Sequence, residues 1–173
     1  SGHGVIVNAA ALALAGIDAK ATDPTGGQVV RDAKGAPTGW LVDTAADPVF
    51  AAQQRALAAL PVAEHLRDTA HCYLWVPNAL LPEGLAVLAA WGFAYKSNLI
   101  WHKVRKDGGP DGRGVGFYFR NTTELVLFGT RGGLRTGSAG RRQVNFLKSR
   151  KREHSRKPDE LYQITELLHD PAC

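Results

Sequence analysis

Short apolar runs separated by turn-forming residues predict a chain of short strands and a few helices. An apolar and aromatic run, His71–Val76, ends at Pro77-Asn78, which predicts a buried strand with a loop at its carboxyl end. Tyr95–Trp101 and Glu124–Gly129 have the same character and predict two more strands. Before residue 53, turn motifs rich in glycine and proline punctuate short apolar stretches, the pattern of short strands.

Helices are predicted where end signals and apolar spacing agree. Pro82 suits the first position of a helix, Glu83 complements the positive end of its dipole, and Gly92 suits its termination. The segment 158–168 opens in the same way, with a proline and two acids. In the opening part of the chain only Asn8–Ile17 looks helical. Alternation of strands and helices predicts a layered α/β domain with a largely parallel sheet.

Two long connections between the predicted strands are expected to be loops. Residues 103–120 contain five glycines, and residues 129–153 are rich in arginine and glycine. Loops of this length in a compact domain are usually functional or disordered. Ligands of an open α/β sheet bind at the carboxyl ends of its strands, where these loops should emerge.

The composition predicts a compact chain in two segments. The 173 residues, 45% of them hydrophobic, are enough for a core. Because no run of 18 uncharged apolar residues occurs, we expect a soluble, cytoplasmic protein without a membrane span. A change of composition near Gln53 predicts a turn-rich segment 1–53, expected to be poorly structured, and a second domain 54–173. Cys72 and Cys173 lie far apart and predict neither a disulfide framework nor a metal site.

Positive charge is concentrated near the end of the chain. Against the single acid Glu153, the segment 131–157 carries ten basic residues, which we call the basic strip: Arg131, Arg135, Arg141, Arg142, Lys148, Arg150, Lys151, Arg152, Arg156 and Lys157. Such a strip neutralises nucleic-acid phosphates and gives affinity without sequence preference. The alternative is a solvated basic loop.

Seven motifs follow one another between about Arg55 and His169. They are Leu60-Pro-Val-Ala-Glu, Tyr73-Leu-Trp-Val-Pro-Asn, Trp91-Gly-Phe-Ala-Tyr, Leu99-Ile-Trp-His-Lys, Gly112-Arg-Gly-Val-Gly-Phe-Tyr-Phe-Arg-Asn, Glu124-Leu-Val-Leu-Phe-Gly-Thr-Arg-Gly and His154-Ser-Arg-Lys-Pro-Asp-Glu-Leu-Tyr. Together they resemble the MT-A70 family of adenine methyltransferases, which act on messenger RNA or on bacterial and phage DNA. The resemblance implies a Rossmann-like α/β methyltransferase fold that uses S-adenosylmethionine and modifies the exocyclic amino group of adenine.

The resemblance also implies residues that hold the methyl donor. Lys157, in the family's His-Ser-x-Lys-Pro motif, is similar to the lysine that contacts the donor's carboxylate, and a helix start attracts anions. His154 and Ser155 would shape the same pocket. A surface lysine at position 157 and a simple helix cap at Ser155 are the alternatives.

The residues implied near the target base belong to the strands and the loops. They are Trp101, Lys103, Arg120 and Glu124, together with Arg152 of the basic strip. Phe117 or Tyr118 could stack on an extruded base. The alternatives are core packing for Trp101 and a surface ion pair with a loop arginine for Glu124.

Two of the family's motifs do not occur in this sequence. The catalytic Asp-Pro-Pro-Trp is absent, and Asp23-Pro24 and Asp47-Pro48 are expected to be turns. The Glu-Leu-Phe-x-Arg strand that holds the donor's ribose is absent too, so the fold is expected to be incomplete at both ends and the catalytic residues stay unassigned. The segment 1–52 instead resembles an internal piece of a metal-dependent amidohydrolase, which suggests a fusion.

Three functions remain open at this point. The first is methyl transfer from S-adenosylmethionine to adenine, with DNA favoured over RNA because small family members resemble bacterial and phage enzymes, in a monomer, homodimer or heterodimer. The second is a catalytically inactive nucleic-acid-binding subunit of that family. The third is an amidohydrolase fragment. The sequence leaves the recognition sequence open.

Overall fold

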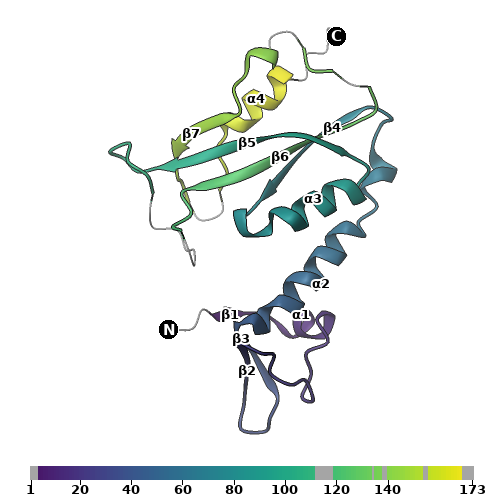
Figure 1. Ribbon diagram of the computed structural model, residues 1–173, viewed down its shortest axis with the longest axis vertical. Coiled ribbons are helices and arrows are strands. Elements are labelled where there is room, and N and C mark those ends of the chain that lie inside the picture. Colours follow the sequence, from purple (N-terminus) through teal and green to yellow (C-terminus); the bar gives the residue numbers. More distant parts are fainter. Residues whose placement is uncertain (1–3, 112–118, 134, 138–139, 154–155, 169–173) are drawn as a thin grey trace. The chain divides into compact units, whose positions relative to one another are not determined.

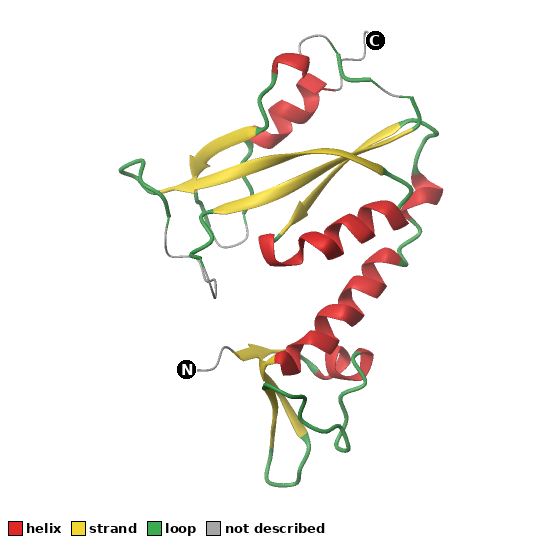
Figure 2. Ribbon diagram, in the orientation of Figure 1, coloured by secondary structure: helices red, strands yellow, loops and turns green. Residues whose placement is uncertain are grey.

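The computed structural model describes residues 4–111, 119–133, 135–137, 140–153 and 156–168. The chain divides into two compact units, Ser1–Leu60 and Pro61–Cys173. Each unit has a small sheet of its own, so the protein is a mixed α/β chain with two sheets (Figure 2). Among the described residues, no helix is long and apolar enough to cross a bilayer.

The first unit is a three-stranded antiparallel sheet with two helices. Its elements are β1 (Gly4–Ile6), α1 (Ala9–Leu14), β2 (Gly27–Arg31), β3 (Pro37–Asp43), the 3-10 turn η1 (Thr44–Ala46) and α2 (Asp47–Ala58). Strand β3 lies between β1 and β2 and pairs antiparallel with both. Asn8 caps α1 by accepting the Ala11 N–H at 2.9 Å, so the helix predicted at 8–17 is confirmed but shorter.

Helix α2 corrects the sequence prediction in this unit. Asp47-Pro48, expected to be a turn, begins the helix, and no helix was expected there. A proline in the first turn removes no intrahelical hydrogen bond, and Asp47 complements the helix dipole, so the pair suits a helix start as well as a turn. Val49 and Ala52 are its buried residues.

The second unit contains four strands and two longer helices. Its elements are η2 (Val62–His65), β4 (Ala70–Val76), η3 (Asn78–Leu80), α3 (Leu81–Ala90), β5 (Ala94–Val104), β6 (Thr123–Arg131), η4 (Gly140–Arg142), β7 (Phe146–Arg150) and α4 (Glu160–Leu168). The three predicted strands and the helices predicted after Pro82 and Pro158 are confirmed. Gly92 ends α3 with a φ of 83°.

Strand β7 was not expected, because it lies inside the segment 129–153 that was predicted to be a loop. Leu147 is its one buried residue, and the basic residues Lys148 and Arg150 follow it. A single buried position in five residues gives no readable alternation of apolar and polar residues. The strand forms because β5 offers it a parallel partner, with Trp101 opposite Leu147.

The prediction of a largely parallel sheet was wrong. The strand order is β4-β6-β5-β7, and β6 pairs antiparallel with both β4 and β5, while β7 pairs parallel with β5. Strands β4, β5 and β7 therefore share one direction, and β6 runs the opposite way between β4 and β5. Helix α3 carries the chain from β4 to a strand of the same direction, whereas β6 is the next strand after β5 and returns beside it.

The two faces of this sheet carry different helices (Figure 1). Helix α3 covers one face, where Val76, Leu88, Phe93 and Leu127 form a core. Helix α4 covers the other, over a core that joins Leu99, Trp101, Val126 and Leu147 to Leu161 and Ile164. Side chains of β4 alternate between the two faces, and the odd-numbered aromatics Tyr73 and Trp75 pack on the α4 side.

Candidate functional site

Three charged side chains meet at one end of the second sheet. Glu124, at the start of β6, accepts a hydrogen bond from Lys103 Nζ at 3.2 Å through Oε1 and another from Lys157 Nζ through Oε2. Lys103 lies at the end of β5, and Lys157 precedes α4. The fractional exposures of the Lys103, Glu124 and Lys157 side chains are 11%, 26% and 36%. We call these three residues the ionic cluster.

Glu124 is ionised at neutral pH. Partial burial raises the pKa of its carboxyl, but hydrogen bonds from Lys157 and Lys103 and their positive charges outweigh burial, so the pKa lies below its ordinary value. The alternative expected from the sequence, an ion pair with a loop arginine, gives way to a pair with two lysines. Glu124 therefore holds two cations in a partly buried place.

Each lysine of the cluster also faces a tryptophan. Lys157 Nζ lies 4.9 Å from the ring centroid of Trp75, and Lys103 Nζ lies 5.8 Å from that of Trp101. The two rings meet edge to face at a centroid distance of 5.8 Å. Electron-rich ring faces attract cations, so the tryptophans help to fix the lysine heads.

Trp101 belongs to the core beneath the cluster. It is 2% exposed, and its Nε1–H donates to Ser149 Oγ of β7 at 2.9 Å. The hydrogen bond satisfies the polar end of a buried indole. Trp101 thus packs and supports Lys103, as in the core-packing alternative.

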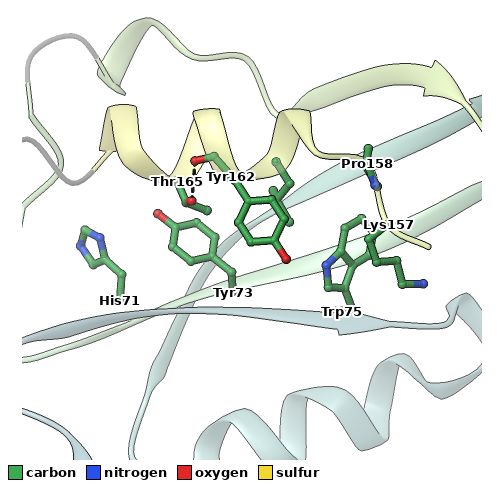
Figure 3. Close-up of a pocket in the computed structure, with 8 residues that line it drawn as sticks. His71, Tyr73, Trp75, Lys157, Pro158, Tyr162 and Thr165 are labelled. Carbon is green, nitrogen blue, oxygen red and sulfur yellow. Dashed lines mark hydrogen bonds between the residues drawn. The ribbon is translucent and has the colours of Figure 1, made fainter. Parts of the chain in front are cut away.

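A pocket opens between β4 and α4 beside the cluster (Figure 3). Its volume is about 510 Å³, and its lining residues are His71, Tyr73, Trp75, Lys157, Pro158, Leu161, Tyr162 and Thr165. In Figure 3 the three β4 side chains point toward α4, and Lys157 and Pro158 lie at the Trp75 end. We call it the aromatic pocket. Its volume is within the range of small-molecule sites, roughly 300–1,000 Å³.

Tyr73 is a neutral part of the pocket wall. Burial raises the pKa of its phenol to about 12, so the hydroxyl keeps its proton at neutral pH. Lys157 is the lysine of the described lining, and it lies at one end of an aromatic wall.

The remaining residues predicted for the site are Arg152, Arg120 and four residues outside the described part of the chain. Arg152 forms surface ion pairs with two acids. It pairs with Asp159, and its Nη2 lies 3.9 Å from Oε2 of Glu160, the first residue of α4. Arg120 is exposed, ahead of β6. His154, Ser155, Phe117 and Tyr118 lie outside the described residues. The structure thus brings together Lys103, Glu124 and Lys157, with Trp101 beneath them.

Sequence reasoning missed Asn78 and the role of Trp75. The Asn78 amide, two residues after the end of β4, donates to the carbonyl and hydroxyl of Thr123 at 3.1 and 3.2 Å and so ties the end of β4 to the start of β6. Both residues belong to the motif Tyr73-Leu-Trp-Val-Pro-Asn, so the signal was present. Their partners are more than forty residues away, which the motif alone could not reveal.

No metal centre is visible in the described segments. There, no group of three or more histidine, cysteine, aspartate or glutamate side chains is arranged to hold an ion.

Comparison with known proteins identifies similarity of two kinds. The profile of the MT-A70 family matches residues 44–172, and that of the amidohydrolase family matches residues 1–73. YtcJ of Bacillus subtilis, a protein named as an amidohydrolase, is 44% identical over 68 residues, which are 39% of this chain and 12% of that relative. The chain thus spans only a small part of the curated relative that it matches, and the two profile matches overlap between residues 44 and 73.

Proposed function

The chain belongs to the MT-A70 family over most of its length, and we propose that it binds S-adenosylmethionine and transfers the methyl group to the exocyclic amino group of adenine in nucleic acid. In this proposal the second unit is part of a Rossmann-like methyltransferase fold. DNA is the favoured polymer, since the small family members that the sequence resembles are bacterial and phage enzymes.

The observation that carries the proposal is the position of Lys157. Its ammonium group lies at one end of the aromatic pocket, against Trp75 and beside the Glu124 carboxylate. The methionine tail of the donor carries a carboxylate and an amino group, and a lysine next to a glutamate offers one partner of opposite charge for each. The residues present therefore fit the charged end of the donor.

The rest of the pocket suits the remainder of such a ligand. Trp75, Tyr73 and Tyr162 provide aromatic surface, which binds flat rings and cationic groups. When bound, the donor supplies an electrophilic methyl group, and displacement at its sulfonium requires no metal. This chain's residues would hold and orient the donor, with Lys157 fixing one end and Glu124 keeping Lys157 in place.

A second candidate function is a family subunit that binds donor or nucleic acid without transferring a methyl group. The observation that favours it is the absence of Asp-Pro-Pro-Trp from the sequence. An adenine amino group is a weak nucleophile and needs hydrogen-bond acceptors to orient it. An active partner would supply them in this case.

Calorimetric titration with S-adenosylmethionine at low salt tests donor binding. We expect the purified chain to bind, Lys157→Ala to lose at least about tenfold in affinity, and Lys151→Ala, which removes an exposed cation outside the pocket lining, to bind like the wild type. No binding by the wild type, or equal binding by both variants, would refute the donor site.

Methyl transfer separates the two candidates. The chain is incubated with donor carrying a labelled methyl group and with adenine-containing DNA or RNA, and N6-methyladenine is measured by mass spectrometry. Methylated DNA supports the first candidate, methylated RNA overturns the preference for DNA, and donor binding without product supports the second.

A further inference from the structure

A second hollow lies where β4 begins and β6 ends. Its volume is about 510 Å³, and it is lined by His71, Lys96, Phe128, Thr130, Gly132, Gly133, Arg135, Thr136 and Arg141. We call it the basic pocket. His71 and Trp75 are four residues apart in β4, about 13 Å at about 3.3 Å per residue, so the basic pocket is distinct from the ionic cluster.

Three cations converge on the basic pocket from separate segments. Lys96 comes from β5, Arg135 from the connection after β6, and Arg141 from η4. None of the lining residues that the structure describes is acidic. Like charges gathered in one hollow repel one another, and a bound anion relieves that repulsion.

These three cations differ in their partners from four other basic residues of the second unit. Lys103, Lys157, Arg152 and Arg156 each pair with a carboxylate. Within the described ranges, Lys96, Arg135 and Arg141 form no ion pair, and all three are exposed. Their charge is therefore available to a ligand.

The rest of the lining suits a phosphate joined to a flat base. The His71 and Phe128 rings meet edge to face, with centroids 5.0 Å apart, and form an aromatic wall. Thr130 and Thr136 add hydroxyl groups, and Gly133 has open space where a side chain would project. Cations beside an aromatic wall are the combination that binds single-stranded nucleic acid.

We propose that the basic pocket binds a backbone phosphate of single-stranded nucleic acid. The choice of a polymer over a free phosphate rests on the proposed function, whereas the preference for a phosphate rests on the three cations. The basic pocket and the basic strip predicted from the sequence share only some residues. Arg135 and Arg141 belong to both, whereas Lys96 belongs to the pocket alone. Lys148, Arg150 and Lys151 of the strip lie on or after β7 and are not among the lining residues.

Fluorescence anisotropy with a labelled single-stranded oligonucleotide, over a series of salt concentrations, tests this proposal. The pocket variant carries Lys96→Gln, Arg135→Gln and Arg141→Gln. The control variant carries Lys148→Gln, Arg150→Gln and Lys151→Gln, which removes the same charge from exposed positions. Circular dichroism and thermal unfolding check that both variants fold.

The pocket variant should bind the oligonucleotide at least about tenfold more weakly than the wild type. The magnitude of the slope of log affinity against log salt should fall by about 2, because each of the three lost phosphate contacts contributes about 0.7. The control variant should lose clearly less affinity for the oligonucleotide than the pocket variant. Equal losses in the two variants, or unchanged binding by the pocket variant, would overturn the proposal.

Two further arms identify the ligand and keep the two proposals apart. Competition by millimolar inorganic phosphate as effective as that by the unlabelled oligonucleotide would assign the pocket to free phosphate and overturn the choice of polymer. Oligonucleotide binding is measured without S-adenosylmethionine, and donor binding is titrated separately. A failed donor site and a failed basic pocket therefore give different results.

Discussion

Replacing Glu124 by glutamine keeps the shape of the side chain and removes the charge that holds Lys103 and Lys157 together. Lys103 is the more buried lysine, at 11% exposure, and it loses its ionic partner in a poorly hydrated place. A hydrogen bond to a charged group stabilises a fold by about 1.5–3 kcal/mol, and the amide oxygen of glutamine can still accept from one lysine. We therefore expect Glu124→Gln to lower the free energy of unfolding of the second unit by about 1–3 kcal/mol.

Urea denaturation followed by tryptophan fluorescence measures this loss. Trp75 and Trp101 touch the ionic cluster, and a Trp40→Phe background removes the tryptophan of the first unit, so that the signal reports the second unit. The matched control is Glu153→Gln, which removes the carboxylate of an exposed pair with Arg156. This control should not shift the midpoint measurably.

The pH dependence has a defined sign. The pKa of Glu124 is lower in the folded protein than its ordinary value of about 4.3, so its ion pairs stabilise the fold fully above that value and are lost as pH falls through the folded pKa. The stability difference between the wild type and Glu124→Gln should be constant between about pH 5 and 7 and should shrink below about pH 4. A difference no larger than that of the control, or one that grows on acidification, would refute this account of the cluster.

Three further predictions concern packing and backbone. Gly132→Ala should lower the free energy of unfolding by about 1–3 kcal/mol, because φ at Gly132 is +67° and a Cβ there would lie 2.5 Å from the Asp68 carbonyl oxygen. The control Gly133→Ala places its Cβ in open space and should unfold in urea like the wild type. Trp101→Phe should lower the free energy of unfolding by about 2–4 kcal/mol, because it removes core volume and the hydrogen bond to Ser149. Trp40→Phe, at an exposed position, should lower it by about 0.5 kcal/mol. Equal urea midpoints for the two variants would contradict the burial of Trp101. Burial raises the pKa of the Cys72 thiol. In a Cys173→Ser variant, a thiol reagent at pH 8 should therefore react with the folded protein at least about tenfold more slowly than with the unfolded chain.

The elements that the sequence predicted correctly are those whose signals are local. His71–Val76 is a continuous apolar run, and α3 has a proline at one end and a glycine at the other. Strand β7 and helix α2 were missed for different reasons. One buried leucine does not make a pattern, and Asp-Pro suits both a turn and a helix start.

The candidate site shows the same division between local and distant signals. Motifs pointed to Lys103, Glu124 and Lys157 separately, but their meeting depends on β6 lying beside β5 and on α4 crossing one face of the sheet. In the parallel sheet that the sequence predicted, β6, which carries Glu124, would have run in the same direction as β5, whereas it runs in the opposite direction. Trp75 and Asn78 were missed because their partners are distant in sequence, and pairing of distant segments is a property of the fold.

The reversed position of β6 has a consequence for the order in which the second unit can assemble. Strands β4 and β5 precede β6 in the chain, yet they lie on either side of it, about 10 Å apart at about 4.8 Å per strand. Until residues 123–131 arrive, the inner edges of both strands have no ladder partner and can pair with a strand of another chain. Because β6 also carries Glu124, the step that joins β4 to β5 is also the step that gives Lys103 its ionic partner, and Lys157 completes the ionic cluster only when the segment before α4 follows.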